Sequence, residues 1–232
     1  MIRPAVAGVD GCRTGWVVAT MGRLGVGSIE IEVVGSIAVV VDRVRAGLLA
    51  AVAIDIPIGL PTAGSRACDI AARRFLPGKA SSVFPAPLRC VLGTGSYPEA
   101  LALSRAAPEG KGLSKQAWFL VRKIAEADAA VRPDERDRIV EASPELCFAA
   151  MAGAPILPSK RTSEGRALRQ MTLAHVGLSP PAGRAVARGA AIDDVLDACA
   201  LLWTADRVAA GEAVHLGGPA VDGTGQPMRI TY

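Results

Sequence analysis

Aromatic side chains are scarce, at 4% of the 232 residues. Proteins that bind single-stranded nucleic acid mainly by base stacking need Phe, Tyr or Trp on their surface, so this composition argues against that class. Apolar runs are short as well. The longest, such as residues 48–54, fall far below the roughly 20 residues that span a bilayer. Because no long apolar stretch precedes Asp10, we expect no signal peptide, no membrane partner and a cytoplasmic location.

Cysteine and histidine occur without the spacing of a metal or redox site. The five cysteines are scattered and contain no C-x-x-C pair, and the two histidines, His175 and His215, lie far apart. A zinc ribbon or a thioredoxin-type site therefore has no support. The odd number of cysteines favours a reducing compartment in which they serve as small core residues.

What the chain does contain is typical of a globular protein. Hydrophobic residues make up 50% and charged residues 21%, which excludes intrinsic disorder. The length fits one large domain or two small ones. The net charge of +4 and a pI near 9.0 permit a polyanionic partner but lie far below the charge of a histone-like protein.

The hydrophobic pattern predicts a sheet before the middle of the chain. Three strand-like runs are followed by a helix with Ser36 as its N-cap and then by a nearly uniform apolar run, which is typical of a strand buried on both faces. These runs cover residues 5–10, 16–20, 28–34, 36–46 and 48–56. Because a helix separates the third and fourth strands, the fourth can pair parallel in the same sheet.

The second half is predicted to be mainly helical. Helical patches alternate with loops rich in Pro, Gly and Ser between about residues 61 and 133, which indicates a helical insertion. A fifth strand over 139–145 is predicted to end in an acid, and helices follow it. These helices cover residues 146–151, 163–175 and 193–210. We therefore predict one α/β domain over 1–232 with a mixed five-stranded sheet flanked by helices.

Three acids end or interrupt the strand-like runs, namely Asp10, Asp55 and Glu145. An ionised carboxylate among Val, Ile and Ala is costly unless it is paired or binds a cation. Each acid alone also has an ordinary interpretation as a capping or salt-bridged residue. Asp55, for example, could cap the turn that Pro57 and Gly59 form.

A second group of acids opens the last predicted helix. Asp194 and Asp197 are three residues apart and lie on one face of its first turns. An acid at a helix start also stabilises the helix, so Asp193 or Asp194 is equally well explained as a cap. Asp197 lies a full turn further in and is not needed for capping.

The two groups of acids meet if the first and fourth strands are neighbours and the last helix packs across their ends. The converging carboxylates would be Asp10, Asp55, Glu145, Asp194 and Asp197. They would repel one another unless cations neutralised them, and ligands that are all oxygen favour Mg²⁺ or Mn²⁺. Two such ions, roughly 3.5–4 Å apart, can hold the attacking and leaving oxygens of a phosphodiester displacement.

Six short motifs stand out along the chain, namely Gly8 to Trp16, Ile54 to Leu60, Ser81 to Phe84, Gly112 to Gln116, Ser143 to Glu145 and Asp193 to Ala198. Together they resemble a bacterial and archaeal family of uncharacterised RNase H-like proteins. The resemblance covers about residues 6–211. It implies an RNase H-like fold and metal-dependent phosphodiester hydrolysis, with the five acids as catalytic groups. Ser143 stands where the family usually has His, so a general acid or base at that point is in doubt.

Four further residues are candidates for binding a substrate. Lys160 and Arg161 precede a predicted helix start, and both clustered cations and helix N-termini favour phosphate. Ser82 lies in a loop of small hydroxyl residues beside cations, and Arg13 lies in the loop after the first strand. Solvated loops are the alternative interpretation of these segments.

The leading hypothesis is therefore a Mg²⁺- or Mn²⁺-dependent nuclease acting on nucleic acid or a nucleotide. One alternative is a nucleotide-binding phosphotransferase, because Asp10-Gly11 with Thr14-Gly15 resembles a phosphate hairpin, although a second such hairpin is missing. Another is a binding module without catalysis on the same fold. Helices rich in alanine are also compatible with a homodimer.

Overall fold

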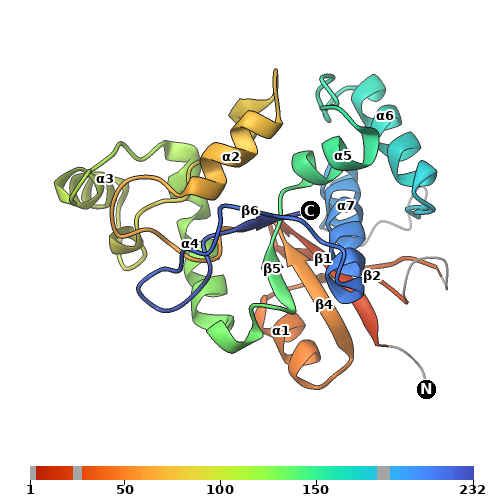
Figure 1. Cartoon of the computed structure of the whole chain (residues 1–232), viewed down its shortest axis with the longest axis horizontal. Coiled ribbons are helices and arrows are strands. Elements are labelled where there is room, and N and C mark those ends of the chain that lie inside the picture. The colour runs from red at the N-terminus through yellow and green to blue at the C-terminus, as the bar shows by residue number, and fades with distance from the viewer. Residues whose placement is uncertain (1–3, 23–27, 182–188) are drawn as a thin grey trace.

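A five-stranded mixed sheet in the order β3-β2-β1-β4-β5 forms the centre of the fold in this computed structural model (Figure 1). The structure describes residues 4–22, 28–181 and 189–232. The strands are β1 (Ala5–Cys12), β2 (Gly15–Met21), β3 (Glu30–Val34), β4 (Leu49–Ile54) and β5 (Ile139–Glu141). The first three pair antiparallel, and β4 pairs parallel with both β1 and β5. The mixed sheet and the pairing of the first and fourth strands are confirmed.

Helices flank both faces of the sheet. They are α1 (Ala38–Arg45), α2 (Ala67–Phe75), α3 (Tyr97–Ala106), α4 (Lys115–Ala130), α5 (Pro144–Ala152), α6 (Ser163–His175) and α7 (Ile192–Ala210). Helices α2 to α4 lie between β4 and β5 in the chain, where the helical insertion was predicted, and Figure 1 shows them on the opposite side of the molecule from α5, α6 and α7. Near the C-terminus, β6 (His215–Leu216) and β7 (Ile230–Thr231) form a short ribbon. Within the described ranges, no helix is long and apolar enough to cross a membrane.

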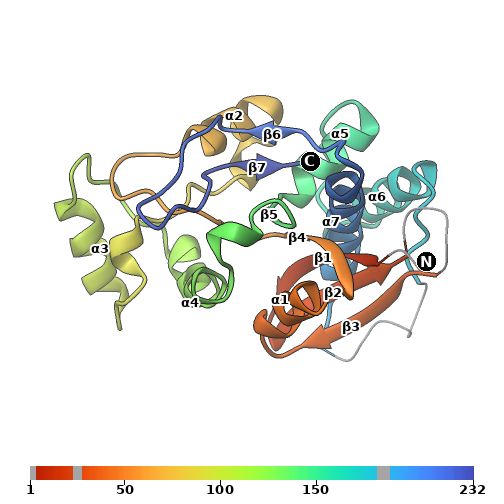
Figure 2. The same cartoon turned by 60° about the horizontal axis from the view of Figure 1, so that its bottom comes forward.

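Successive residues of β1 and β4 alternate between two apolar layers, because side chains of a strand point to opposite faces. Ala53 belongs to the layer formed with α5, α6 and α7, whereas Val9 and Ile54 belong to the layer formed with α1 and α4. Figure 2 shows α7 and α1 on opposite sides of the sheet. Asp10 and Asp55 follow Val9 and Ile54 directly, so the alternation directs both toward the α7 layer. The five cysteines are free thiols, and all but Cys90 are buried.

One predicted element boundary near the site is wrong. The fifth strand does not continue to Glu145 but ends at Glu141, and α5 begins at Pro144. Proline fits the first position of a helix because its fixed φ is already helical and it lacks the N–H that would go unpaired there. Glu145 therefore lies in the first turn of α5, where its charge also favours the positive end of the helix.

The predicted N-cap of α1 is also wrong. Ile37 occupies the N-cap position and makes no side-chain capping bond. Ser36 lies one residue earlier, and its hydroxyl accepts a hydrogen bond from the Ala38 N–H at 3.2 Å. The helix thus begins one residue later than the hydroxyl suggested, because local hydrogen bonds to Ser also occur in turns outside a helix.

Gly8 allows α7 to pack directly against β1. A Cβ atom at position 8 would lie 2.1 Å from both the Ala198 carbonyl oxygen and the Leu202 nitrogen. Real atoms never approach so closely, so any side chain here would force the helix away from the strand. This contact matters for the site because α7 carries Asp194 and Asp197.

We expect Gly8→Ala to lower the free energy of unfolding by about 3 kcal/mol or more, since the added methyl group overpacks a backbone contact that cannot relax. Gly35→Ala is the matched control. A Cβ at Gly35 would meet no atom within 4 Å, so its effect should stay within about 0.5 kcal/mol. Urea denaturation of both proteins measures the difference, and equal losses would contradict the packing described here.

Candidate functional site

A cavity of about 500 Å³ lies near the carboxyl ends of β1, β4 and β5. Its charged lining residues are Asp10, Asp55, Asp69, Lys123, Glu141, Glu145, Lys160, Arg161, Asp194 and Asp197. All five acids predicted from the sequence therefore meet in one place, and Lys160, Arg161 and Ser82 line the same cavity. Arg13 does not line it and lies exposed on the turn between β1 and β2.

Parallel pairing of β1 and β4 places Asp10 and Asp55 side by side. Val9 is paired with Ile54, and the Asp55 N–H continues the ladder by donating to the Val9 carbonyl oxygen at 3.0 Å. Asp10 is only 8% exposed, and its Oδ1 accepts from the Gly11 N–H at 2.8 Å. Two carboxylates thus leave the sheet at the same edge and on the same face.

Helix α7 and the loop before α6 add a third carboxylate and a cation. Asp197, at 2% exposure, forms an ion pair with the Lys160 ammonium group. Burial opposes the charge of Lys160, but attraction to Asp197, Asp10 and Asp55 outweighs it and raises the lysine pKa. The ammonium group is therefore a partly exposed cation that offsets charge on these three acids.

Lys160 alone does not neutralise the charge of Asp10, Asp55 and Asp197. Burial, together with repulsion from Asp197 and Asp55, raises the pKa of Asp10 well above its usual range. Asp55 opens to the cavity, yet the protein around it displaces much of its hydration; this desolvation and repulsion from Asp197 raise its pKa to about 7. Burial raises the pKa of Asp197 to about 6, although Lys160 counteracts the shift. Near neutral pH these side chains would hold protons or attract a further cation.

Glu145 and Asp194 differ from these three because each has a defined partner. Glu145 accepts from the fully buried Arg169 at 2.7 Å, with Lys79 3.8 Å away. Asp194 accepts from the Ala191 N–H at 3.0 Å, which is the capping contact that the sequence left open for it. Glu145 is thus paired with a cation, whereas Asp194 caps α7 and still adds to the repulsion on Asp10.

The donor chemistry of the cavity fits a hard cation, but the side chains do not form a closed ligand set. Carboxylate oxygens are the ligands that Mg²⁺ and Mn²⁺ prefer, and the Lys160 ammonium group shows that the acids accept a cation. As the side chains stand in the part of the chain that the structure describes, no three of His, Cys, Asp or Glu are grouped so as to hold a metal ion.

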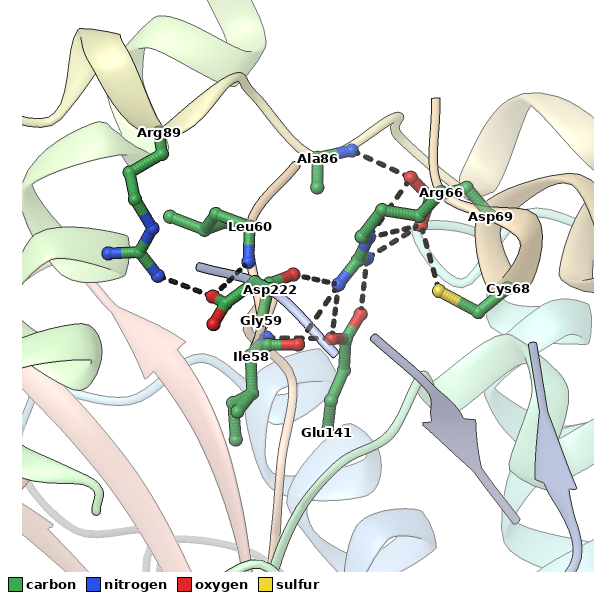
Figure 3. A network of polar contacts seen from close by, with 10 residues as sticks. All are labelled: Ile58, Gly59, Leu60, Arg66, Cys68, Asp69, Ala86, Arg89, Glu141 and Asp222. Atoms are coloured by element: carbon green, nitrogen blue, oxygen red, sulfur yellow. Dashed lines mark hydrogen bonds and ion pairs between the residues drawn. The ribbon is translucent and has the colours of Figure 1, made fainter. Parts of the chain in front are cut away.

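Sequence reasoning missed a buried network centred on Arg66 (Figure 3). Arg66 is 2% exposed. Its guanidinium group donates to both oxygens of Glu141 at 2.7 Å and to Asp69 at 2.6 Å. It also donates to the carbonyl oxygens of Ile58 and Gly59 at 3.2 Å. Burial raises the pKa of Glu141 to about 7 against the opposing effect of Arg66.

This network fixes the segments around the cavity. Glu141 accepts from the Ile58 N–H at 2.7 Å, which anchors the segment following Asp55 to the end of β5. Asp69 accepts from the Ala86 N–H at 3.0 Å and so anchors the loop after Ser82. The available signal was Glu141 itself, an acid that ends the apolar run of β5.

A second missed residue is Lys123 on α4, which lines the cavity opposite α7. Its ammonium group donates to the Gly15 carbonyl oxygen at 2.6 Å and lies 4.2 Å from the centre of the Trp16 ring. Burial lowers the pKa of Lys123. Its position depends on how the insertion folds back on β1 and β2, which no local pattern in α4 reveals.

We expect Arg66→Met to lower the free energy of unfolding by about 3–5 kcal/mol, because it leaves two buried carboxylates without their cation. Arg74→Met is the control, because Arg74 is an exposed residue of α2, the helix whose N-cap is Arg66. It should change stability by less than about 0.5 kcal/mol. Chemical denaturation monitored by circular dichroism compares the two. An Arg66→Met protein as stable as the wild type would show that the network is not structural.

Fold and cavity together define a mixed α/β protein whose acids from two parallel strands and a covering helix meet at one edge of the sheet. The chain belongs to the family described as protein of unknown function (DUF429), whose model matches residues 8–221. The expected membership of an uncharacterised family is thereby confirmed, and the matched range contains all five predicted acids and Lys160. No curated protein and no solved structure matched the chain.

Proposed function

We propose that this protein is a Mg²⁺- or Mn²⁺-dependent hydrolase of phosphodiester bonds that acts on nucleic acid through an RNase H-like domain. The main support for this proposal is that Asp10, Asp55 and Asp197 line one cavity, where their combined negative charge exceeds the single positive charge of Lys160. The strand order β3-β2-β1-β4-β5, with acids on β1, after β4 and on the last helix, supports the RNase H-like assignment.

Each wall of the cavity has a part in the proposed reaction. Asp10 and Asp55 would hold a divalent ion, which supplies Lewis-acid activation of the phosphodiester and of the attacking water. Lys160 and Arg161 place positive charge where negative charge develops on the phosphoryl oxygens. Ser143 lines the cavity but does not exchange a proton near neutral pH, so proton transfer would rely on the carboxylates.

Cleavage of a mixed panel of single-stranded, double-stranded and hybrid nucleic acids tests the proposal. We expect cleavage with Mn²⁺ or Mg²⁺ and none with EDTA. Asp10→Asn, purified in parallel to expose contaminating nucleases, should lose activity by about a thousandfold or more. Full activity of Asp10→Asn would refute the assignment.

A binding module without catalysis is the second candidate. It is favoured by one observation, that Lys160 already pairs with Asp197 while the described side chains form no closed ligand set. Such a module should bind nucleic acid equally well in Mn²⁺ and in EDTA, cleave nothing and gain no thermal stability from Mn²⁺. An enzyme should be stabilised, because an ion that binds only the folded state raises its stability.

A further inference from the structure

The backbone on both sides of Lys160 is held in place. A Cβ atom at Gly165 would lie 2.0 Å from the Ser159 carbonyl oxygen, so the start of α6 packs tightly on the loop that carries Lys160. Arg169 donates to the Pro158 carbonyl oxygen at 3.2 Å, and the Thr162 hydroxyl donates to that of Ser159 at 2.8 Å. The loop therefore has a fixed conformation that directs Lys160 toward α7.

The ammonium end of the Lys160 side chain contacts one acid and is attracted by two others. Its ammonium group pairs with Asp197 and is attracted by Asp10 and Asp55, while the side chain is 37% exposed. Arg161, the next cation along the chain, is exposed and lines the cavity, and no ion pair is formed between it and these acids. Lys160 thus contributes its charge to the cluster directly, whereas its neighbour does not.

Charge balance then limits how many divalent ions the cluster can hold. Asp10, Asp55 and Asp197 carry three negative charges when ionised. Lys160 offsets one of them, and a single divalent ion would offset the other two. Glu145 adds little to this balance because it is paired with Arg169. Asp194, which caps the start of α7, repels Asp10 less than Asp197 and Asp55 do. A second divalent ion would create excess positive charge beside the ammonium group, and like charges at short range are strongly unfavourable.

We propose that Lys160 is a built-in cation that takes the place of a second metal ion, so that the cluster binds one divalent ion rather than two. The inference rests on the proposed function, since it assumes that the acids bind a metal at all. It replaces the two-ion expectation drawn from the sequence. Lys160 serves as a positioning and charge-balancing residue of the site.

Counting Mn²⁺ bound per chain tests this inference without any substrate. The full chain, freed of metal, is titrated with Mn²⁺, and binding is followed by calorimetry and by the electron paramagnetic resonance signal of free Mn²⁺. We expect one ion for the wild type. Lys160→Met should bind two ions, or one ion with an affinity raised roughly tenfold or more, because the competing charge is gone.

Two further variants serve as controls. Lys160→Arg keeps the charge and should bind one ion with an affinity near that of the wild type. Arg161→Met removes a cation from the same cavity wall without removing an ion pair to the acids, and it should also bind one ion. Circular dichroism checks that each protein is folded. Should Lys160→Met fail to fold, Lys160→Gln, which retains a hydrogen-bond donor, carries the same prediction.

The outcomes separate the inference from the proposed function. Two ions in the wild type would overturn the inference and leave the proposed function standing. Unchanged stoichiometry and affinity in the folded Lys160→Met or Lys160→Gln protein would also overturn it. If neither the wild type nor the Lys160→Met or Lys160→Gln protein binds Mn²⁺, the proposed function itself is overturned, and the inference with it.

Discussion

Asp10→Asn is expected to unfold less readily than the wild type when metal is absent, by about 1–3 kcal/mol at pH 8. Asp10 is buried beside Asp55 and Asp197, so its ionised form is repelled by both and poorly hydrated. The neutral amide removes that repulsion and still offers an oxygen to the Gly11 N–H that Asp10 now binds. Urea denaturation in EDTA measures the gain.

Added Mn²⁺ should reverse this ranking. The wild type should gain stability in proportion to its Mn²⁺ affinity, about 2.7 kcal/mol at a hundredfold excess over the dissociation constant, whereas Asp10→Asn should gain little. Asp193→Asn is the control, because Asp193 lies in the first turn of the helix that carries Asp197 but does not line the cavity. A metal-free Asp10→Asn protein less stable than the wild type would mean that Asp10 is structural rather than a strained ligand.

The second large effect is a loss of stability as pH rises in the absence of metal. Burial raises the pKa of Asp197 to about 6, and burial also raises those of Asp55 and Glu141 to about 7. The folded state thus holds protons that the unfolded state releases above about pH 4, so stability falls as pH rises toward and through 7. Asp197 alone should contribute on the order of 2 kcal/mol, and Asp55 less than its shift implies because it faces water.

Guanidinium denaturation at pH 5 to 8 in EDTA measures this slope. Acids with lowered pKa values, such as Asp222 at about 2, act only below this range, where protonation would cost stability. Comparison with Asp55→Asn separates the contribution of the acid cluster from that of other titrating groups. His215 is one such group, and its lowered pKa makes stability rise with pH. The stability of Asp55→Asn should fall less steeply with pH than that of the wild type. Parallel profiles would show that Asp55 does not titrate as described.

Much of the sheet could be predicted because its signals are local. Alternating apolar residues identify β3, the uniform apolar run identifies β4, and a helix between them implies parallel pairing. The sequence left open whether β4 pairs with β1, and that pairing makes Asp10 and Asp55 neighbours. The predicted element for Glu145 is wrong because β5 ends at Glu141 and Pro144 starts a helix.

The pairing of charges could not be predicted because it joins distant segments. Arg66 and Glu141 are 75 residues apart, and Lys160 and Asp197 are 37 apart. No spacing rule connects such residues, and each pair depends on how the insertion and α6 pack against the sheet. The sequence therefore indicated where negative charge would gather but not which cations would already be present. This difference is the basis for our proposal of one metal ion in place of two.

The position of a bound metal decides whether Asp10 and Asp55 form a metal site. Crystals soaked in Mn²⁺ would be measured for anomalous scattering, which locates Mn²⁺ independently of any assumed ligand. We expect a peak in the cavity, about 2.1 Å from carboxylate oxygens of both Asp10 and Asp55. A peak confined to acids outside the cavity, or none in the cavity at saturating Mn²⁺, would contradict it.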